Sequence, residues 1–104
     1  MDESLKFAEQ SVLGSMLRDN AVIGDVALLV RKDDFYADAH QRVFAAVLAL
    51  WERGRPADAV TLADALAEAG GIADVGGYGY LGVLWEAAPT AASAEHYARI
   101  VRDH

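Results

Sequence analysis

The densest group of side chains that could carry out chemistry lies between residues 33 and 40. Asp33, Asp34, Asp38 and His40 supply three carboxylates and one imidazole within this short stretch. Hard cations bind carboxylate oxygens, and a carboxylate close to an imidazole can act as a general acid and base. These four residues define one hypothesis for the chain, which is a small metal-dependent hydrolase.

The same residues have an explanation that needs no ligand. Asp38 stands where a helix start favours a side-chain acceptor, and Gln41 follows it in the capping-box position. Asp33 or Asp34 can cap the turn that follows them, and His40 falls on the apolar stripe of the next helix. The sequence favours capping, and we assign no catalytic and no metal-binding residue.

Glycines between residues 77 and 82 match the G-x-G-x-x-G spacing of dinucleotide-binding loops. That fingerprint needs a strand before the loop and a second strand after the helix, and the sequence predicts neither. A flexible connector and a helix that allows close packing explain these glycines. The phosphate-binding G-x-x-x-x-G-K-[ST] pattern, a nucleophile-elbow serine and cysteine are also missing from the sequence. We therefore assign no cofactor-binding residue and expect neither covalent catalysis nor ATP hydrolysis by this chain.

Composition restricts the class of protein further. The 104 residues, of which 54% are hydrophobic, predict a single domain with one core over 1–104. The acidic start does not resemble a secretory leader, no apolar run reaches the roughly 20 residues that cross a bilayer, and cysteine is absent. We expect a cytoplasmic protein.

The formal net charge of −7 conflicts with a helix-turn-helix DNA reader, because cations supply most of the affinity for nucleic acid.

Hydrophobic residues recur with a period near 3.6, which predicts an all-α fold, a compact bundle of five to six short helices. The first helix carries an apolar stripe from Leu5 to Leu17, in which Gly14 lets a neighbour approach closely. The second helix follows Asn20, although the apolar run 26–30 could by itself pass for a buried strand.

The third helix has the clearest pattern, and we expect it to organise the core. It begins with Asp38 as N-cap and ends at Gly54, and Phe44, Leu48 and Trp51 follow its apolar face. Each large apolar side chain contributes about 1.5 to 3 kcal/mol when buried, before entropy is subtracted. Replacement of Trp51 by alanine is accordingly expected to cost about 3 to 5 kcal/mol.

Turn residues place the remaining elements. Phe35 and Tyr36 are expected to pin a one-turn element against the core. Thr61 marks the start of a short fourth helix, and the fifth helix must finish before Pro89. The sixth helix starts within 90–93 and reaches the last residue without a glycine or proline, so its end is expected to be cut.

The fifth helix contains two tyrosines two positions apart. Tyr78 and Tyr80 point about 200° apart on a helix. We therefore expect one of them to face outward or toward a partner.

A series of short motifs follows in a recognisable order along almost the whole chain. Each is weak alone, but their order and spacing over about 95 residues argue against chance. The motifs are Ala8 to Gly14, Asp34 to Tyr36, His40 with Phe44, Gly54 to Asp58, Val60 to Leu62, Gly76 with Gly77, Tyr80 with Leu81, Pro89 to Ala92 and Tyr97 to Val101. In this order the chain resembles the N-terminal domain of bacterial replicative DNA helicases of the DnaB type.

The resemblance implies a non-catalytic helical head that pairs with its neighbours, as a dimer, in a hexameric helicase ring. It implies a part in DNA replication within the primosome, where the head helps to dock the C-terminal domain of primase, whose own fold is related. The last helix, about 91–104, would lead into a helical hairpin, a linker and a RecA-like helicase domain that are missing here. ATP and Mg²⁺ are expected only in that domain. The start of the chain, 1–7, departs from the family because it lacks a proline-containing lead-in.

We expect the partner-binding surface on the final helix. Tyr97, Ile100 and Val101 are the candidates, because a helix that continues in the family leaves apolar positions that meet the hairpin. The alternative is that all three residues pack inward, as apolar residues generally do. Two alternatives for the whole chain come from related folds, which are a helicase-binding domain of primase and a loader-related helical domain.

Overall fold

The computed structural model describes residues 1–88 and 90–104, and its elements there are all helical. Short 3-10 turns connect most of the helices, and the described residues contain no strand, which confirms the predicted all-α fold. None of the helices in these two ranges has the length and apolarity needed to span a membrane. The helices are α1 (Glu3–Arg18), α2 (Ile23–Leu29), α3 (Asp38–Glu52), α4 (Ala59–Glu68), α5 (Gly77–Ala87) and α6 (Ala94–Asp103), and the turns are η1 (Asn20–Val22), η2 (Lys32–Asp34), η3 (Ala73–Val75) and η4 (Ala91–Ser93).

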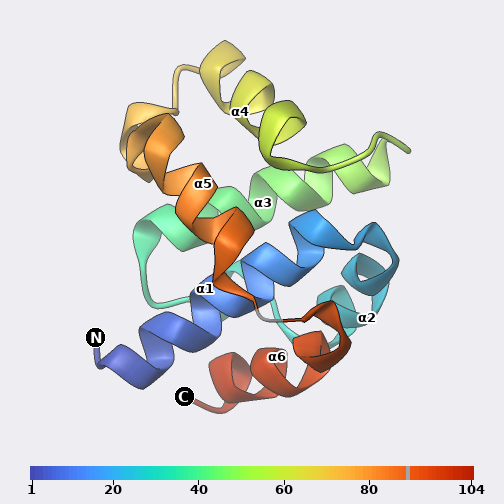
Figure 1. The fold of residues 1–104 in the computed structure, drawn as a ribbon, viewed down its shortest axis with the longest axis vertical. Coiled ribbons are helices and arrows are strands. Elements are labelled where there is room, and N and C mark those ends of the chain that lie inside the picture. The colour runs from blue at the N-terminus through green and yellow to red at the C-terminus, as the bar shows by residue number, and fades with distance from the viewer. Residues whose placement is uncertain (89) are drawn as a thin grey trace.

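The first helix, and not the third, organises the core. α1 runs through the middle of the molecule, and α3, α5 and α6 pack around it (Figure 1). Every residue from Ala8 to Leu17 is buried, so the polar side chains in this stretch are enclosed together with the apolar stripe. A stripe pattern predicts one buried face, whereas α1 buries all of them because its neighbours cover each side.

The start of α3 differs from the prediction. Its N-cap is Ala37, and Asp38 is the first helical residue, whose carboxylate accepts a hydrogen bond from Nε of Arg42 at 2.7 Å. Gln41 forms no capping box, and its side-chain amide instead donates to the carbonyl of Phe35 at 2.7 Å. The predicted cap at Asp38 is therefore wrong.

α4 starts two residues before the predicted Thr61. Asp58 is the N-cap, and its carboxylate accepts the backbone N–H groups of Val60 and Thr61, both at 2.9 Å. The Thr61 hydroxyl accepts the backbone N–H of Asp58 at 2.9 Å in return. Thr61 is thus the third residue of a capping box, not its first, and the helix begins at Ala59.

The fifth helix ends where the sequence indicated. α5 finishes at Ala87, and Ala88 adopts an extended conformation. Pro89, which was predicted to close this helix, lies outside the described residues. After it the chain makes the η4 turn, whose N-cap Thr90 accepts the N–H of Ala92 at 3.2 Å, before α6 begins at Ala94.

The loop before α4 is fastened to the end of α1 by one side chain. The Asn20 amide nitrogen donates to the carbonyls of Met16 at 2.9 Å and Ala57 at 2.8 Å. Its amide oxygen accepts the N–H of Ala57 at 2.9 Å. Three hydrogen bonds from a single residue therefore fix where the loop between α3 and α4 crosses α1.

Phe35 is buried as predicted, whereas Trp51, which was predicted to be buried, is not. Phe35 is buried, and its ring lies 5.0 Å from that of buried Phe44, so it does pin the η2 turn, whereas neighbouring Tyr36 is exposed. Trp51 is 41% exposed and lies outside the core, because the inward face of α3 includes Leu50. The Trp51 ring instead borders Gly24 of α2.

Gly14 lets two helices approach closely, as the sequence predicted. A Cβ atom added at Gly14 would lie 2.2 Å from the Leu84 carbonyl oxygen of α5, a distance that no real contact allows. Gly82 of α5 is different, since a Cβ there would meet no atom within 4 Å.

Alanine at Gly14 should therefore destabilise the fold. Because the obstructing atom is backbone, α1 and α5 would have to separate, and we expect Gly14→Ala to cost about 1 to 3 kcal/mol of unfolding free energy. Gly82→Ala is the matched control, and it should gain about 0.5 to 1 kcal/mol from helix propensity. Urea denaturation followed by circular dichroism measures both, and equal effects would contradict the close approach.

Burial separates the two aromatic residues of α3 that the sequence placed on one apolar face. Phe44→Ala should cost about 3 to 5 kcal/mol because it leaves a cavity in the core. Trp51→Ala should cost clearly less than Phe44→Ala, since its ring already contacts solvent. Denaturant midpoints of the two variants compare them, and a Trp51 loss equal to that of Phe44 would show that Trp51 belongs to the core.

Candidate functional site

The four residues of the hydrolase hypothesis do not converge. Asp33 is exposed, Asp34 accepts a backbone N–H within its own turn at 2.8 Å, and Asp38 pairs with an arginine of α3. His40 is buried and faces α1, away from all three. Among the residues that the structure describes, no three histidine, aspartate or glutamate side chains are grouped to hold a metal ion. Asp34 and His40 thus have the local structural roles expected of them, whereas Asp38 pairs with Arg42 and is not the predicted cap.

His40 meets a buried carboxylate that the sequence did not single out. Oε1 of Glu9, on α1, lies 2.7 Å from Nδ1 of His40, and the Glu9 side chain is fully buried. Oε2 of Glu9 accepts the backbone N–H of Tyr36 at 2.7 Å, and Oε1 also accepts that of Ala37 at 3.4 Å. Glu9 therefore holds the two backbone N–H groups that lead into α3, those of Tyr36 and of the N-cap Ala37, from across the core.

Tyr80 of α5 completes the network on the other side of the imidazole. Its hydroxyl lies 2.5 Å from Nε2 of His40, and the two rings are stacked with an interplanar angle of 13°. Gln10 of α1 donates its amide N–H to the same hydroxyl at 3.1 Å. One assignment of protons uses every donor: His40 Nδ1 donates to Glu9, and the Tyr80 hydroxyl donates to His40 Nε2 while it accepts from Gln10.

This series of carboxylate, imidazole and hydroxyl has the order of a catalytic triad, but its contacts are structural. The phenolic oxygen of Tyr80 already accepts from Gln10, and the carboxylate of Glu9 is occupied by backbone groups at the start of α3. Together the side chains join α1, α3 and α5. We assign the network a structural role, because buried polar groups of this kind must be paired with one another to be tolerated.

The glycines of the G-x-G-x-x-G match serve two different purposes. Gly77, the first residue of α5, and Gly76, which precedes the match, adopt φ angles of 81° and 106°, which other residues rarely adopt, and they form the predicted connector into this helix. Gly79 and Gly82 lie on α5 with open space at their Cβ positions, so the expected close packing there is wrong. Outward-facing Tyr78 and inward-facing Tyr80 confirm that the two tyrosines diverge.

The three candidates for partner binding on α6 separate into two groups. Val101 is buried in the core, so its expected place on the exposed side is wrong. α6 packs against α1 and α2, and Val101 lies on the face that contacts them. Ile100 is 39% exposed, and Tyr97 is half-buried at the edge of the core. An outward apolar surface on α6 therefore consists of Tyr97 and Ile100.

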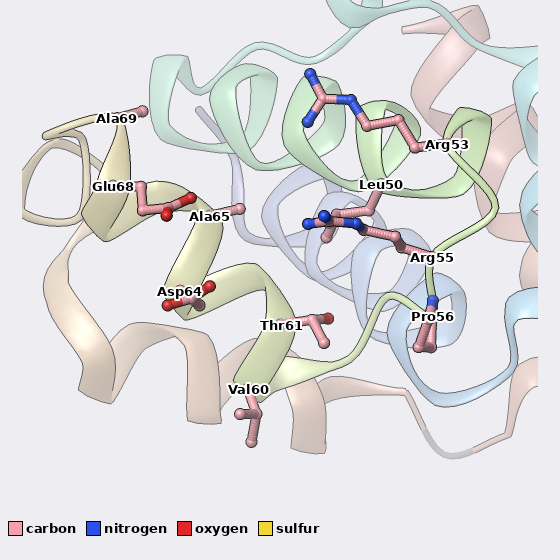
Figure 2. Close-up of a pocket in the computed structure, with 10 residues that line it drawn as sticks. All are labelled: Leu50, Arg53, Arg55, Pro56, Val60, Thr61, Asp64, Ala65, Glu68 and Ala69. Atoms are coloured by element: carbon pink, nitrogen blue, oxygen red, sulfur yellow. The ribbon is translucent and has the colours of Figure 1, made fainter.

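A hollow of about 630 Å³ lies between the end of α3, the following loop and α4 (Figure 2). Arg53 and Arg55 stand on one wall, and Asp64 and Glu68 stand on the wall formed by α4. None of these four side chains forms an ion pair within the described residues. The opposed charges and the wide opening make this a surface groove, unlike the enclosed and mostly apolar sites that hold small ligands.

The network makes Tyr80 and Tyr78 a matched pair for mutation. Tyr80→Phe removes the partner of His40 Nε2 and of the Gln10 amide, and we expect it to cost about 1 to 3 kcal/mol. Tyr78→Phe removes a hydroxyl from an exposed residue and should change the unfolding free energy by less than about 0.5 kcal/mol. Thermal melts of both variants provide the comparison, and a negligible loss for Tyr80→Phe would refute the network.

Comparison with known proteins identifies the family of this domain. The family model of the DnaB-like helicase N terminal domain matches residues 2–103. The replicative DNA helicase DnaB of Mycobacterium leprae is 50% identical over 96 residues, which are 92% of this chain and 16% of the relative. The same helicase of Geobacillus stearothermophilus is 43% identical over 96 residues, which are 92% of this chain and 21% of the relative.

A solved structure agrees with the sequence relatives. The crystal structure of the N-terminal domain of DnaB helicase from Mycobacterium tuberculosis matches with a TM-score of 0.91 and 49% identity, covering 93% of this chain and 70% of that chain. The chain thus spans 16% and 21% of the length of these helicases and 70% of the solved N-terminal domain, while the family model matches nearly all of this chain. It belongs to the family of DnaB-like helicase N-terminal domains, which confirms the resemblance seen in its motifs.

Proposed function

We propose that this chain is a non-catalytic interaction domain of a replicative DNA helicase, which contributes to ring assembly and to the docking of primase. The observation that carries the proposal is the family match over residues 2–103. The buried polar side chains support it, because the Glu9, His40 and Tyr80 network joins helices to one another. ATP and Mg²⁺ would bind in a separate helicase domain, and the whole protein would act in DNA replication in the cytoplasm.

The surface proposed for these contacts is the outer side of α6. Tyr97 and Ile100 are three residues apart, so they are neighbours on one side of the helix. The rings of His96 and Tyr97 meet in an edge-to-face arrangement with their centres 6.3 Å apart, and Glu95 and Arg99 form an ion pair on the same helix. Apolar groups mixed with charges in this way are typical of interfaces between proteins that also exist apart.

Two further functions are less well supported. A helicase-binding domain of primase and a loader-related domain share a related fold, but the relatives that match this chain at 43% to 50% identity are named replicative helicases. Direct DNA binding is opposed by the net charge of −7.

Binding of the cognate primase C-terminal domain to this chain tests the proposal by calorimetry. We expect saturable binding, and we expect Tyr97→Ala and Ile100→Ala each to weaken it at least about fivefold, the loss that an interface side chain of average importance causes. Val83→Ala on α5 is the control, since it also shortens an exposed apolar side chain. It should leave binding unchanged.

Sedimentation of the chain over a range of concentrations tests self-association separately. Dimer formation that Ile100→Ala weakens would support a role in ring assembly. A chain that remains monomeric and binds no primase would contradict both parts of the proposal. Primase binding that both α6 variants, Tyr97→Ala and Ile100→Ala, leave unchanged would show that α6 is not the contact surface.

A further inference from the structure

An open apolar trough follows the line along which α4 and α5 pack against each other. Two adjoining hollows of about 490 and 510 Å³ form it and share Ala59, Val60 and Gly82. Asp58 of α4 lines the same end as Trp85 of α5, and Ala67 lines the same end as Tyr78, so the two helices run antiparallel along the trough. α4 and the start of α5 lie at the end of the molecule away from α6 (Figure 1).

The side chains on the walls of the trough are large, apolar and exposed, whereas the residues on its floor are small. Val60 is 78% exposed on one wall, and Tyr78 is 64% exposed on the other. Between them, Ala59, Ala63 and Gly82 leave room, and a Cβ atom at Gly82 would meet nothing within 4 Å. Exposed apolar groups that border a recess mark a surface for contact with another molecule.

The charged side chains that line the trough are acidic, and a cation lies only beside its Trp85 end. Asp58, Asp64 and Glu86 line the trough, and no lysine or arginine is among its lining residues. Arg18 approaches the outer end, where its guanidinium lies 5.6 Å from the centre of the Trp85 ring and donates to the Trp85 carbonyl at 3.3 Å. An occupant that places cations beside an apolar face would therefore be complementary to this surface.

We propose that the trough binds an amphipathic helix of a partner protein whose apolar face is flanked by lysine or arginine. The wall from Ala59 to Ala67 is about 12 Å long at 1.5 Å per residue, which accommodates two to three turns of such a helix. Side chains at positions i, i+3 or i+4, and i+7 of the partner would enter between Val60 and Tyr78. A second copy of this chain fits less well, because it carries the same net charge of −7.

This surface is separate from the outer side of α6, so the inference does not depend on the proposed docking of primase there. Its test uses the 104-residue chain and a fluorescein-labelled, 14-residue helical peptide with leucines on one face and lysines beside them. A second peptide has glutamate in place of each lysine. We expect fluorescence anisotropy to show that the lysine peptide binds at least about tenfold more tightly than the glutamate peptide.

Two variants with the same change of charge distinguish the trough from general attraction to an acidic protein. Val60→Arg fills the trough and should weaken binding of the lysine peptide at least about tenfold. Leu28→Arg on α2 replaces a side chain that is 86% exposed and lies outside the trough, and it should weaken binding less than about twofold. Circular dichroism confirms that both variants fold.

Three results would overturn the proposal. They are equal binding of the two peptides, equal weakening by Val60→Arg and Leu28→Arg, and no binding of either peptide. Sedimentation adds a fourth, because a dimer of the chain that Val60→Arg dissociates would assign the trough to a second copy. A monomer that binds the lysine peptide through Val60 is the supporting result.

Discussion

A carboxylate enclosed at the centre of a small domain must be supplied with hydrogen-bond donors, and the fold is arranged around that requirement. Glu9 receives two backbone N–H groups at the start of α3 and the imidazole of His40, which in turn meets Tyr80 of α5. Removal of any one partner would leave a buried polar group unpaired, which is more costly than the hydrogen bond itself is favourable. The network therefore fixes the mutual position of three helices that apolar packing alone would leave free to slide.

Much of the fold could be predicted from local patterns, whereas the network could not. Helical periodicity gave the all-α architecture, and Gly14 was correctly read as a point of close approach. Periodicity cannot show that a helix is covered on every side, so Glu9 was passed over although it lies within the apolar stretch of α1. The two cap predictions are wrong for different reasons: Asp38 pairs with Arg42 inside α3, and the capping box of α4 begins at Asp58 and has Thr61 as its third helical residue. Trp51 shows that a residue placed on the apolar stripe by its spacing can still lie outside the core, at the end of the helix.

The surface properties follow from the same arrangement. Because α1 occupies the centre, α3, α5 and α6 cover its sides, while α4 packs on α3 and α5 farther from α1. The two surfaces with apolar character, on α6 and between α4 and α5, consequently lie at separate places on the domain. A domain of a replicative helicase built in this way could contact two different proteins at once, with no need for one to displace the other.

The hydrogen bonds of Asn20, and not its shape, restrict which residue could replace it. Aspartate has nearly the same size and outline, but it has no N–H to offer to the carbonyls of Met16 and Ala57. Hydrolysis of the amide during storage would make the same replacement without any mutation. Chemical ageing at a single position would thus remove two of the three hydrogen bonds of this side chain and leave only the one that the Ala57 N–H donates.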